Sequence, residues 1–177
     1  MVGFRENYKN GIESFYKNNC NNYINPHFDD IKKTLNYISN IKLNSDPILD
    51  LCAGSGEITL GINDLFANEI IGSDPFTFDL YKKNTNKVVF DWSFDDIMNG
   101  CMENYSFSII FCSYALHLCS KSKIKLVCLE LSRRSKYLCI ISPHKKPHIS
   151  ENMGWKLKNT NKYKKIHMRF YDSLTNY

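Results

Sequence analysis

No stretch of this 177-residue sequence approaches the run of about 18 apolar residues that a membrane-spanning helix requires. The first residues, Met1–Glu6, also lack the apolar core of a secretory signal. Internal repeats and linker-like stretches are absent as well, and the 43% hydrophobic content suits one α/β core of this length. The sequence therefore predicts a cytoplasmic protein that makes no membrane contact and forms one domain over residues 1–177.

The cysteines show no pattern typical of disulfides or zinc. Their number, seven, is odd, and no C-x-x-C pair occurs. Cys52, Cys112, Cys128 and Cys139 fall in or beside apolar stretches, which favours buried free thiols. We therefore predict no metal site.

The net charge of +5 is unevenly placed, because the basic residues crowd into the second half of the chain. They form four groups, at positions 121–125, 133–136, 145–146 and 156–169. Solvated helix faces and basic strand edges explain most such groups. A nucleic-acid partner held through this basic second half stays an alternative.

The most informative segment is 47–57, where an apolar strand ends in Asp50 and runs into a tight loop of small residues. Glycine in such a loop lets the backbone approach a ligand, and the helix that follows offers free N–H groups to an anion. The dinucleotide fingerprint G-x-G-x-x-G, counted from Gly54, would need a third glycine where Thr59 stands. The segment predicts a nucleotide-like ligand that is not a dinucleotide.

Three further apolar segments end in polar residues at regular positions. The second strand, at 69–73, ends at Asp74, which follows Asp50 by 24 positions. A carboxylate at this place can accept hydrogen bonds from both ribose hydroxyls of a nucleoside. The third strand, 87–90, ends at Asp91, and the fourth, 107–112, leads into the segment 113–118.

This order of strand ends resembles motif I and the later motifs of class I S-adenosylmethionine (SAM)-dependent methyltransferases, from about Ile48 to the end of the chain. The chain looks like a small member of the methyltransferase type 11/12/25-like group. Cys52 stands where that family most often has its first glycine, and we expect a small thiol to fit because the backbone there need not take positive φ.

The resemblance implies SAM as the cofactor and suggests a role for several residues. Asp50 would pair with the amino group of SAM, directly or through water, Asp74 would hold the ribose, and Phe76 or Trp92 would lie against the adenine. Tyr114 and Tyr23 are candidates for an aromatic face beside the sulfonium. The expected cofactor-binding residues are Asp50, Cys52, Ala53, Gly54, Ser55, Gly56, Asp74, Pro75, Phe76, Asp91, Trp92, Ser93, Phe94, Ser113, Tyr114 and Tyr23.

The predicted fold is α/β, a doubly wound, mostly parallel, seven-stranded Rossmann-like sheet with an antiparallel C-terminal hairpin. Residues 1–41 would form an N-terminal cap and first helix, 47–142 the cofactor-binding core, and 143–177 an acceptor-side loop and closing hairpin. Apolar periodicity predicts helices near 26–41, 58–66 and 122–136. A fifth strand is expected at 137–141, and hairpin strands near 154–157 and 166–171. Only a very short helix is expected between the second and third strands, and little room is left for one between the fifth and sixth.

Methyl transfer from a sulfonium is an in-line displacement, so the protein mainly aligns the reacting groups and supplies a base where the acceptor carries a proton. His144, His117 and His27 are the candidate bases, because histidine titrates near neutrality and all three are expected near the acceptor. A structural role for His117 and a helix-capping role for His27 are open alternatives. An enzyme that works by proximity alone would need none of them.

The sequence thus predicts a SAM-dependent methyltransferase whose acceptor, a small molecule, a protein or RNA, is not identified. Two alternatives stay open. The short acceptor side fits a non-catalytic SAM-binding or scaffold subunit completed by a partner subunit, and the basic second half fits an RNA methyltransferase.

Overall fold

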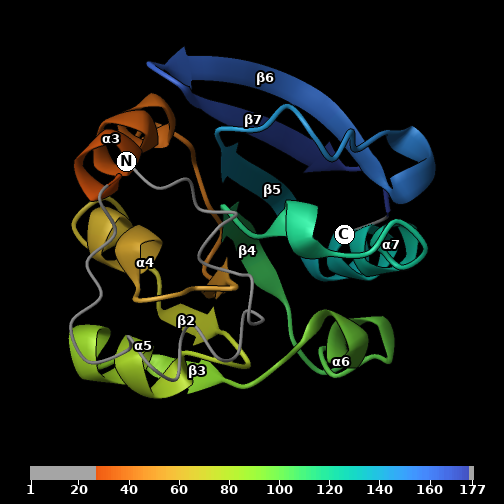
Figure 1. The fold of residues 1–177 in the computed structure, drawn as a ribbon, viewed down its shortest axis with the longest axis horizontal. Helices are drawn as coiled ribbons and strands as arrows, with labels where there is room; N and C mark the ends of the chain where they lie inside the picture. The colour runs from red at the N-terminus through yellow and green to blue at the C-terminus, as the bar shows by residue number, and fades with distance from the viewer. Residues whose placement is uncertain (1–26, 176–177) are drawn as a thin grey trace, which may run out of the picture.

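The computed structural model describes residues 27–175 and contains one seven-stranded sheet with the order β3-β2-β1-β4-β5-β7-β6 (Figure 1). The strands are β1 Ile48–Leu51, β2 Ile70–Ser73, β3 Val88–Phe90, β4 Phe107–Ser113, β5 Ser135–Ser142, β6 Trp155–Tyr163 and β7 Ile166–Ser173. Strands β1 to β5 pair in parallel, whereas β7 is antiparallel to both β5 and β6. The predicted doubly wound sheet with a C-terminal hairpin is confirmed.

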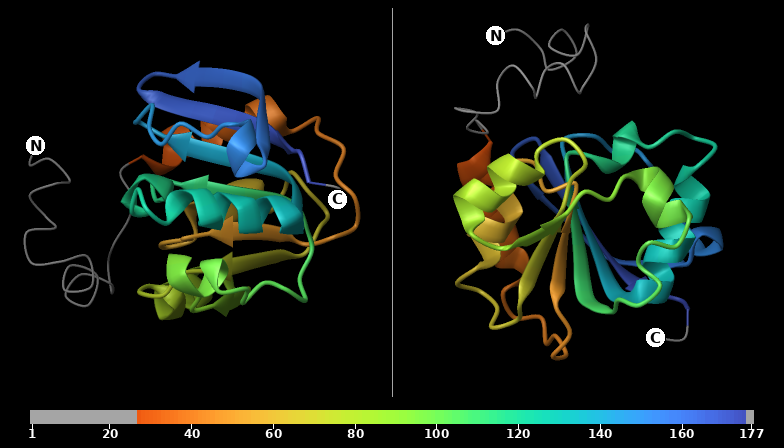
Figure 2. Two further views of the ribbon diagram at one scale, coloured as in Figure 1. Left: turned by 90° about the vertical axis from the view of Figure 1, so that its right-hand side faces the viewer. Right: turned by 90° about the horizontal axis from the view of Figure 1, so that it is seen from below.

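Helices cover both faces of the sheet (Figure 2). They are α3 Phe28–Leu35, α4 Glu57–Ile62, α5 Phe78–Thr85, α6 Phe94–Met98 and α7 Ile124–Arg134, with short 3-10 turns η1 Asn36–Ile38, η2 Leu116–Leu118 and η3 Glu151–Met153. Helices α3, α4 and α5 lie on one face, and α6 and α7 lie on the other (Figure 2). Each face has its own hydrophobic core, one centred on α3 and α4 and one on α7.

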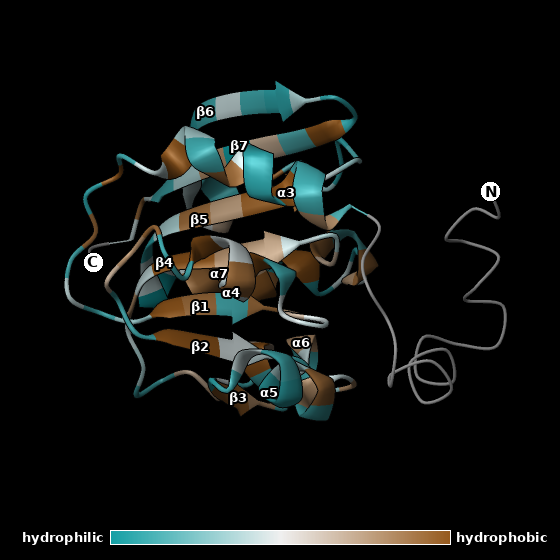
Figure 3. Cartoon of the chain, turned by 90° about the vertical axis from the view of Figure 1, so that its left-hand side faces the viewer, coloured by the Kyte–Doolittle hydropathy of each residue, from teal (hydrophilic) through white to brown (hydrophobic). Residues whose placement is uncertain are grey.

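The central strands are continuous apolar runs because they are buried on both faces. All four residues of β1 are buried, as are six of the seven in β4. Hydrophobic residues accordingly gather in β1, β2, β4 and β5, while the edge strand β6 is largely hydrophilic (Figure 3). Lysines along β6 are typical of an edge strand that must not pair with another chain.

Several predicted boundaries are wrong. The helix expected near 58–66 ends at Ile62, and the one expected near 26–41 gives way to the 3-10 turn η1 after Leu35. The helix expected to reach position 136 ends at Arg134, because Ser135 already pairs with Phe107 in the sheet.

Two further expectations on element length are wrong. Helix α5, between β2 and β3, has eight residues rather than being very short. Strand β6 extends to Tyr163, well beyond the expected 154–157, because its antiparallel pairing with β7 continues along its whole length. The short connection between β5 and β6 is as expected, with only η3 in it.

The topology fixes where a ligand can bind. Strand β1 lies between β2 and β4. The chain builds β2 and β3 on one side of β1 and then crosses over to build β4 and β5 on the other side. In doubly wound sheets this reversal opens a crevice at the carboxyl ends of the strands. The residues that follow β1, β2, β4 and β5 therefore meet at one edge of the sheet.

Candidate functional site

The loop after β1 has the tight geometry that its small residues predicted. Gly54 and Gly56 have φ of 58° and 94°, in the left-handed region that favours glycine. A Cβ on Gly56 would lie 2.5 Å from Cγ2 of Thr85, so a side chain has no room there. Glycine is thus needed for both conformation and space.

Cys52 corrects one expectation. We expected its backbone to avoid positive φ, but its φ is 55°. For a residue with a Cβ this left-handed conformation costs about 1–2 kcal/mol. The backbone after β1 therefore keeps the shape that glycine favours, and the cysteine adopts it under strain.

Asp74 fastens this loop to the second strand. Its Oδ2 accepts a hydrogen bond from the Gly54 N–H at 3.1 Å, while Oδ1 accepts from the N–H groups of Phe76 and Thr77, both at 2.9 Å. The hydroxyl of Thr77 returns a bond to the Gly54 carbonyl at 2.9 Å. Three of the roughly four lone-pair positions of this carboxylate are thus occupied by backbone donors.

Asn84 adds a second anchor, because its Nδ2 donates to the Ser55 carbonyl at 3.0 Å. Of the remaining loop residues, Ala53 is buried and its N–H donates to Ser73 in β2. Pro75 is half-buried and Phe76 is exposed beside Asp74. The loop and the residues after β2 form one connected unit.

Asp50 lies deeper than expected. Its Oδ2 accepts from both the N–H and the hydroxyl of Thr59, at 3.1 and 2.8 Å, and the Thr59 hydroxyl also bonds the Tyr81 hydroxyl at 2.8 Å. Burial raises the pKa of Asp50 to about 8, with smaller contributions from Glu57 and Asp74. One carboxylate oxygen therefore serves helix α4 rather than a ligand. The partner, Thr59, is the residue that replaces the third glycine of the dinucleotide fingerprint, but its role was not predicted.

The residues expected near the adenine lie at the end of β3. Trp92 stacks on Phe90 with ring centroids 4.2 Å apart, and Tyr105 packs edge-on against it at 5.1 Å. Ser93 caps helix α6 in a reciprocal bond with Asp96, which lowers the pKa of Asp96. Its side chain is thus engaged in the helix. Asp91 is exposed and Phe94 is half-buried.

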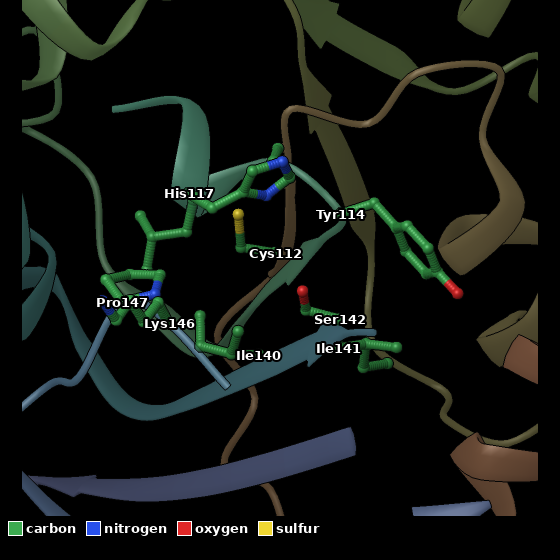
Figure 4. A pocket seen from close by; sticks show the side chains of 10 residues that line it. Cys112, Tyr114, His117, Ile140, Ile141, Ser142, Lys146 and Pro147 are labelled. Atoms are coloured by element: carbon green, nitrogen blue, oxygen red, sulfur yellow. The ribbon is translucent and has the colours of Figure 1, made fainter. Parts of the chain in front are cut away.

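The carboxyl ends of β4 and β5 border a small, partly open pocket (Figure 4). Its lining consists of Cys112, Tyr114, Ala115, Leu116, His117, Ile140, Ile141, Ser142, Lys146 and Pro147. Ser113, the last residue of β4, is half-buried beside it. Tyr114 has φ of 56°, and its ring points away from Cys112 and Ser142 (Figure 4).

The structure brings the three candidate histidines to this region. The rings of His117 and His144 lie 4.9 Å apart at an angle of 58°. The ring of His27 stacks on Tyr114 at 5.7 Å. The turn η2 and the loop after β5 thus place His117 and His144 beside the pocket, whereas His27 lies against the outward-pointing ring of Tyr114. Tyr23 lies outside the described residues.

Arg169 is a residue that the sequence reasoning missed. It lies on β7, is only 7% exposed, and its Nη1 donates to the carbonyls of Lys145 and Pro147 at 2.8 and 2.7 Å. These two bonds bracket Lys146 in the loop that connects β5 to η3. A coil needs partners for its carbonyl groups, and Arg169 supplies them.

Within residues 27–175, no group of three or more His, Cys, Asp or Glu side chains is arranged to hold a metal ion. The cysteines of this part of the chain are all free thiols. In the same range, no helix is long and apolar enough to cross a membrane.

The fold is that of class I SAM-dependent methyltransferases. The TehB-like SAM-dependent methyltransferase of Corynebacterium glutamicum is 13% identical, with a TM-score of 0.59 over 84% of this chain and 100% of its own. Magnesium protoporphyrin IX methyltransferase (ChlM) of Synechocystis, solved with bound SAM, is 12% identical, with a TM-score of 0.61 over 96% and 94% of the two chains. The PH0226 protein of Pyrococcus horikoshii is 11% identical, with a TM-score of 0.68 over 92% and 100%.

Among curated proteins, the uncharacterized protein C17A5.05c of Schizosaccharomyces pombe is 26% identical over an alignment that covers 96% of this chain and 91% of the yeast protein. No protein-family profile matches the sequence. The similarity thus extends over nearly the whole length of both chains but names no activity.

Proposed function

We propose that this protein transfers the methyl group of SAM to an acceptor that binds at the carboxyl ends of β4 and β5. The observation that carries the proposal is the bond between Asp74 and the Gly54 N–H, because it joins an acid at the tip of β2 to a glycine loop at the tip of β1. The likeness to ChlM, which was solved with SAM, supports the same cofactor.

The residues present fit such a cofactor. The left-handed glycines leave the backbone of the loop open to close approach, and Asp74 offers hydrogen-bond acceptors beside it. Because Oδ1 already accepts two bonds and Oδ2 only one, Oδ2 can take one ribose hydroxyl. We infer one direct ribose bond to Asp74 rather than the two that the sequence suggested.

Bound SAM supplies an electrophilic methyl group on a positively charged sulfur. The chain has to hold the acceptor in line with that methyl group and exclude water around it. His144 and His117 are exposed at the pocket, where a neutral imidazole can take the proton that the acceptor loses.

The experiment has two parts. Isothermal titration with SAM tests the cofactor site, and incubation with methyl-labelled SAM and fractionated cell extract asks whether label enters small molecules, protein or RNA. We expect binding and transfer. A folded protein that fails to bind SAM at millimolar concentration would contradict the proposal, and Asp79→Asn, on the exposed surface of α5, is a matched control for changes at Asp74.

A non-catalytic scaffold role is the second candidate, and the coil that replaces a helix between β5 and β6 is the observation that favours it. Such a subunit would bind SAM but transfer label to no fraction until a partner subunit is added. The RNA alternative is less well supported, because Lys158 and Lys164 are already paired with Asp172 and Asp30. If RNA binds, its affinity should fall steeply with salt concentration.

A further inference from the structure

The pocket at the ends of β4 and β5 is bordered by basic side chains. Lys146 and His117 line it, and His144 lies against His117 with ring centroids 4.9 Å apart. These three residues are exposed, so a ligand that enters from solvent can reach them. The neighbouring Lys145 is exposed too.

Acidic side chains of residues 27–175 do not balance the charge of the two lysines. The pocket lining contains no aspartate or glutamate. Within residues 27–175, none of the ion pairs involves Lys145, Lys146 or Arg169. The loop after β5 therefore carries positive charge that no carboxylate of the described residues pairs with.

Arg169 adds a buried positive charge behind the pocket wall. Its strand partner is Ile140, and its Nη1 bonds the carbonyl of Pro147, and both of these residues line the pocket. Its Nε and Nη2 are buried and make no hydrogen bond of good geometry with the described residues, although the guanidinium lies close enough to the Tyr171 hydroxyl to lower its pKa against the rise that burial causes. A buried guanidinium without a compensating negative charge is costly, so an anion nearby would stabilise it.

We propose that the methyl acceptor is a small molecule with a carboxylate or phosphate group, and that Lys146 binds this group at the mouth of the pocket. The assignment rests on the proposed methyltransferase function. An ammonium group forms strong charge-assisted hydrogen bonds to such oxygens, and the charge of Arg169 adds to the attraction from behind the wall.

The confined lining of the pocket favours a small acceptor over a macromolecule. All of the lining residues lie at the ends of β4 and β5 or in the loops that follow these two strands. The lysines on β6 and in the β6–β7 turn are not part of the lining, so the pocket does not continue into a long basic groove.

The test is a titration of inorganic phosphate, and separately of acetate, into the protein at constant pH and ionic strength. Imidazole NMR signals of His117 and His144 report binding at the pocket. We expect both anions, or one of them, to shift these signals, with about tenfold or more weaker binding in Lys146→Gln. Lys165→Gln, an exposed lysine in the β6–β7 turn, is the matched control and should behave like the wild type.

The proposal would be overturned if the histidine signals shift equally in the wild type, Lys146→Gln and Lys165→Gln, or if they shift in none of the three. A short RNA that moves the same signals through Lys146, where phosphate and acetate do not, would overturn the small-molecule assignment. Titration of S-adenosylhomocysteine into the same samples keeps the two proposals apart. If it fails to bind, the proposed function fails, whereas the anion titration of the free protein still decides on the Lys146 site.

Turnover gives an independent check. Cell extract is first separated on an anion-exchange column, and each fraction is then offered as acceptor with methyl-labelled SAM. Label should enter material from the retained fraction. With that material as acceptor, the apparent KM of Lys146→Gln should be about tenfold higher than that of the wild type, with a smaller change in kcat. Label that enters only the unretained fraction would refute an anionic acceptor.

Discussion

Asp74 combines two roles that two substitutions can separate. In Asp74→Asn the side-chain oxygen can still accept the two bonds from the N–H groups of Phe76 and Thr77. The bond from the Gly54 N–H is lost, because the amide NH₂ that replaces Oδ2 is itself a donor. Asp74→Ala loses all three bonds. A hydrogen bond to a charged group contributes about 1.5–3 kcal/mol, so we expect Asp74→Asn to lower the free energy of unfolding by about 1–2 kcal/mol and Asp74→Ala by about 2–4 kcal/mol.

Binding of S-adenosylhomocysteine should weaken by about 10- to 100-fold in Asp74→Asn, which corresponds to about 1.4–2.8 kcal/mol. Looser attachment of the loop alone could produce part of this loss. The 2′-deoxy and 3′-deoxy analogues of the ligand resolve the question, because one of them already lacks the hydroxyl that Asp74 would accept. For that analogue, wild type and Asp74→Asn should bind with nearly equal affinity. If the loss in Asp74→Asn is the same for all three ligands, Asp74 does not hold the ribose.

Three further outcomes are expected. The folded-state pKa of Asp50, about 8, exceeds its ordinary value of 3.8. The free energy of unfolding should therefore fall by about 2 kcal/mol or more as pH rises from about 4 to 8. Urea titrations of Asp50→Asn should no longer show this fall. His144→Ala should lower kcat by about 100-fold and leave SAM affinity within about twofold; equal losses in both would place His144 in the cofactor site. Gly72→Ala should lower the free energy of unfolding by about 1–3 kcal/mol, since the new Cβ would lie 2.4 Å from the Tyr81 ring, and an unchanged midpoint of urea unfolding would contradict the packing.

The sheet was predictable because burial on both faces leaves an unmistakable pattern. Strands such as β1 and β4 are unbroken apolar runs, and the acids or small residues after them mark the edge where ligands bind. The boundary between α7 and β5 was not predictable. Ser135 and Lys136 continue a helical pattern locally, but they join the sheet because Phe107 on β4 offers a pairing partner.

The site shows the same division. The three histidines were identified one at a time, because each lies close to a predicted strand end or helix start. The rings of His117 and His144 lie close together because β4 pairs with β5 and because the loop after β5 turns back toward η2. A local sequence pattern contains neither of these facts. Arg169 alternates with apolar residues, a pattern that predicts an exposed side chain on a strand. Its burial is explained by its bonds to the carbonyls of Lys145 and Pro147, which lie more than 20 positions earlier in the sequence.

Helix α3 has partners that are made long after it. Asp30 pairs with Lys164, 134 positions later, and Lys33 lies over the ring of Tyr163. The apolar side of α3 also shares a core with Met168 and Phe170 on β7. A ribosome adds about 5–20 residues per second, so this helix emerges several seconds before its partners exist. During synthesis the part of its hydrophobic face that packs against β7 stays open to chaperones and proteases, and a chain stalled just before the hairpin should be degraded faster than the finished one.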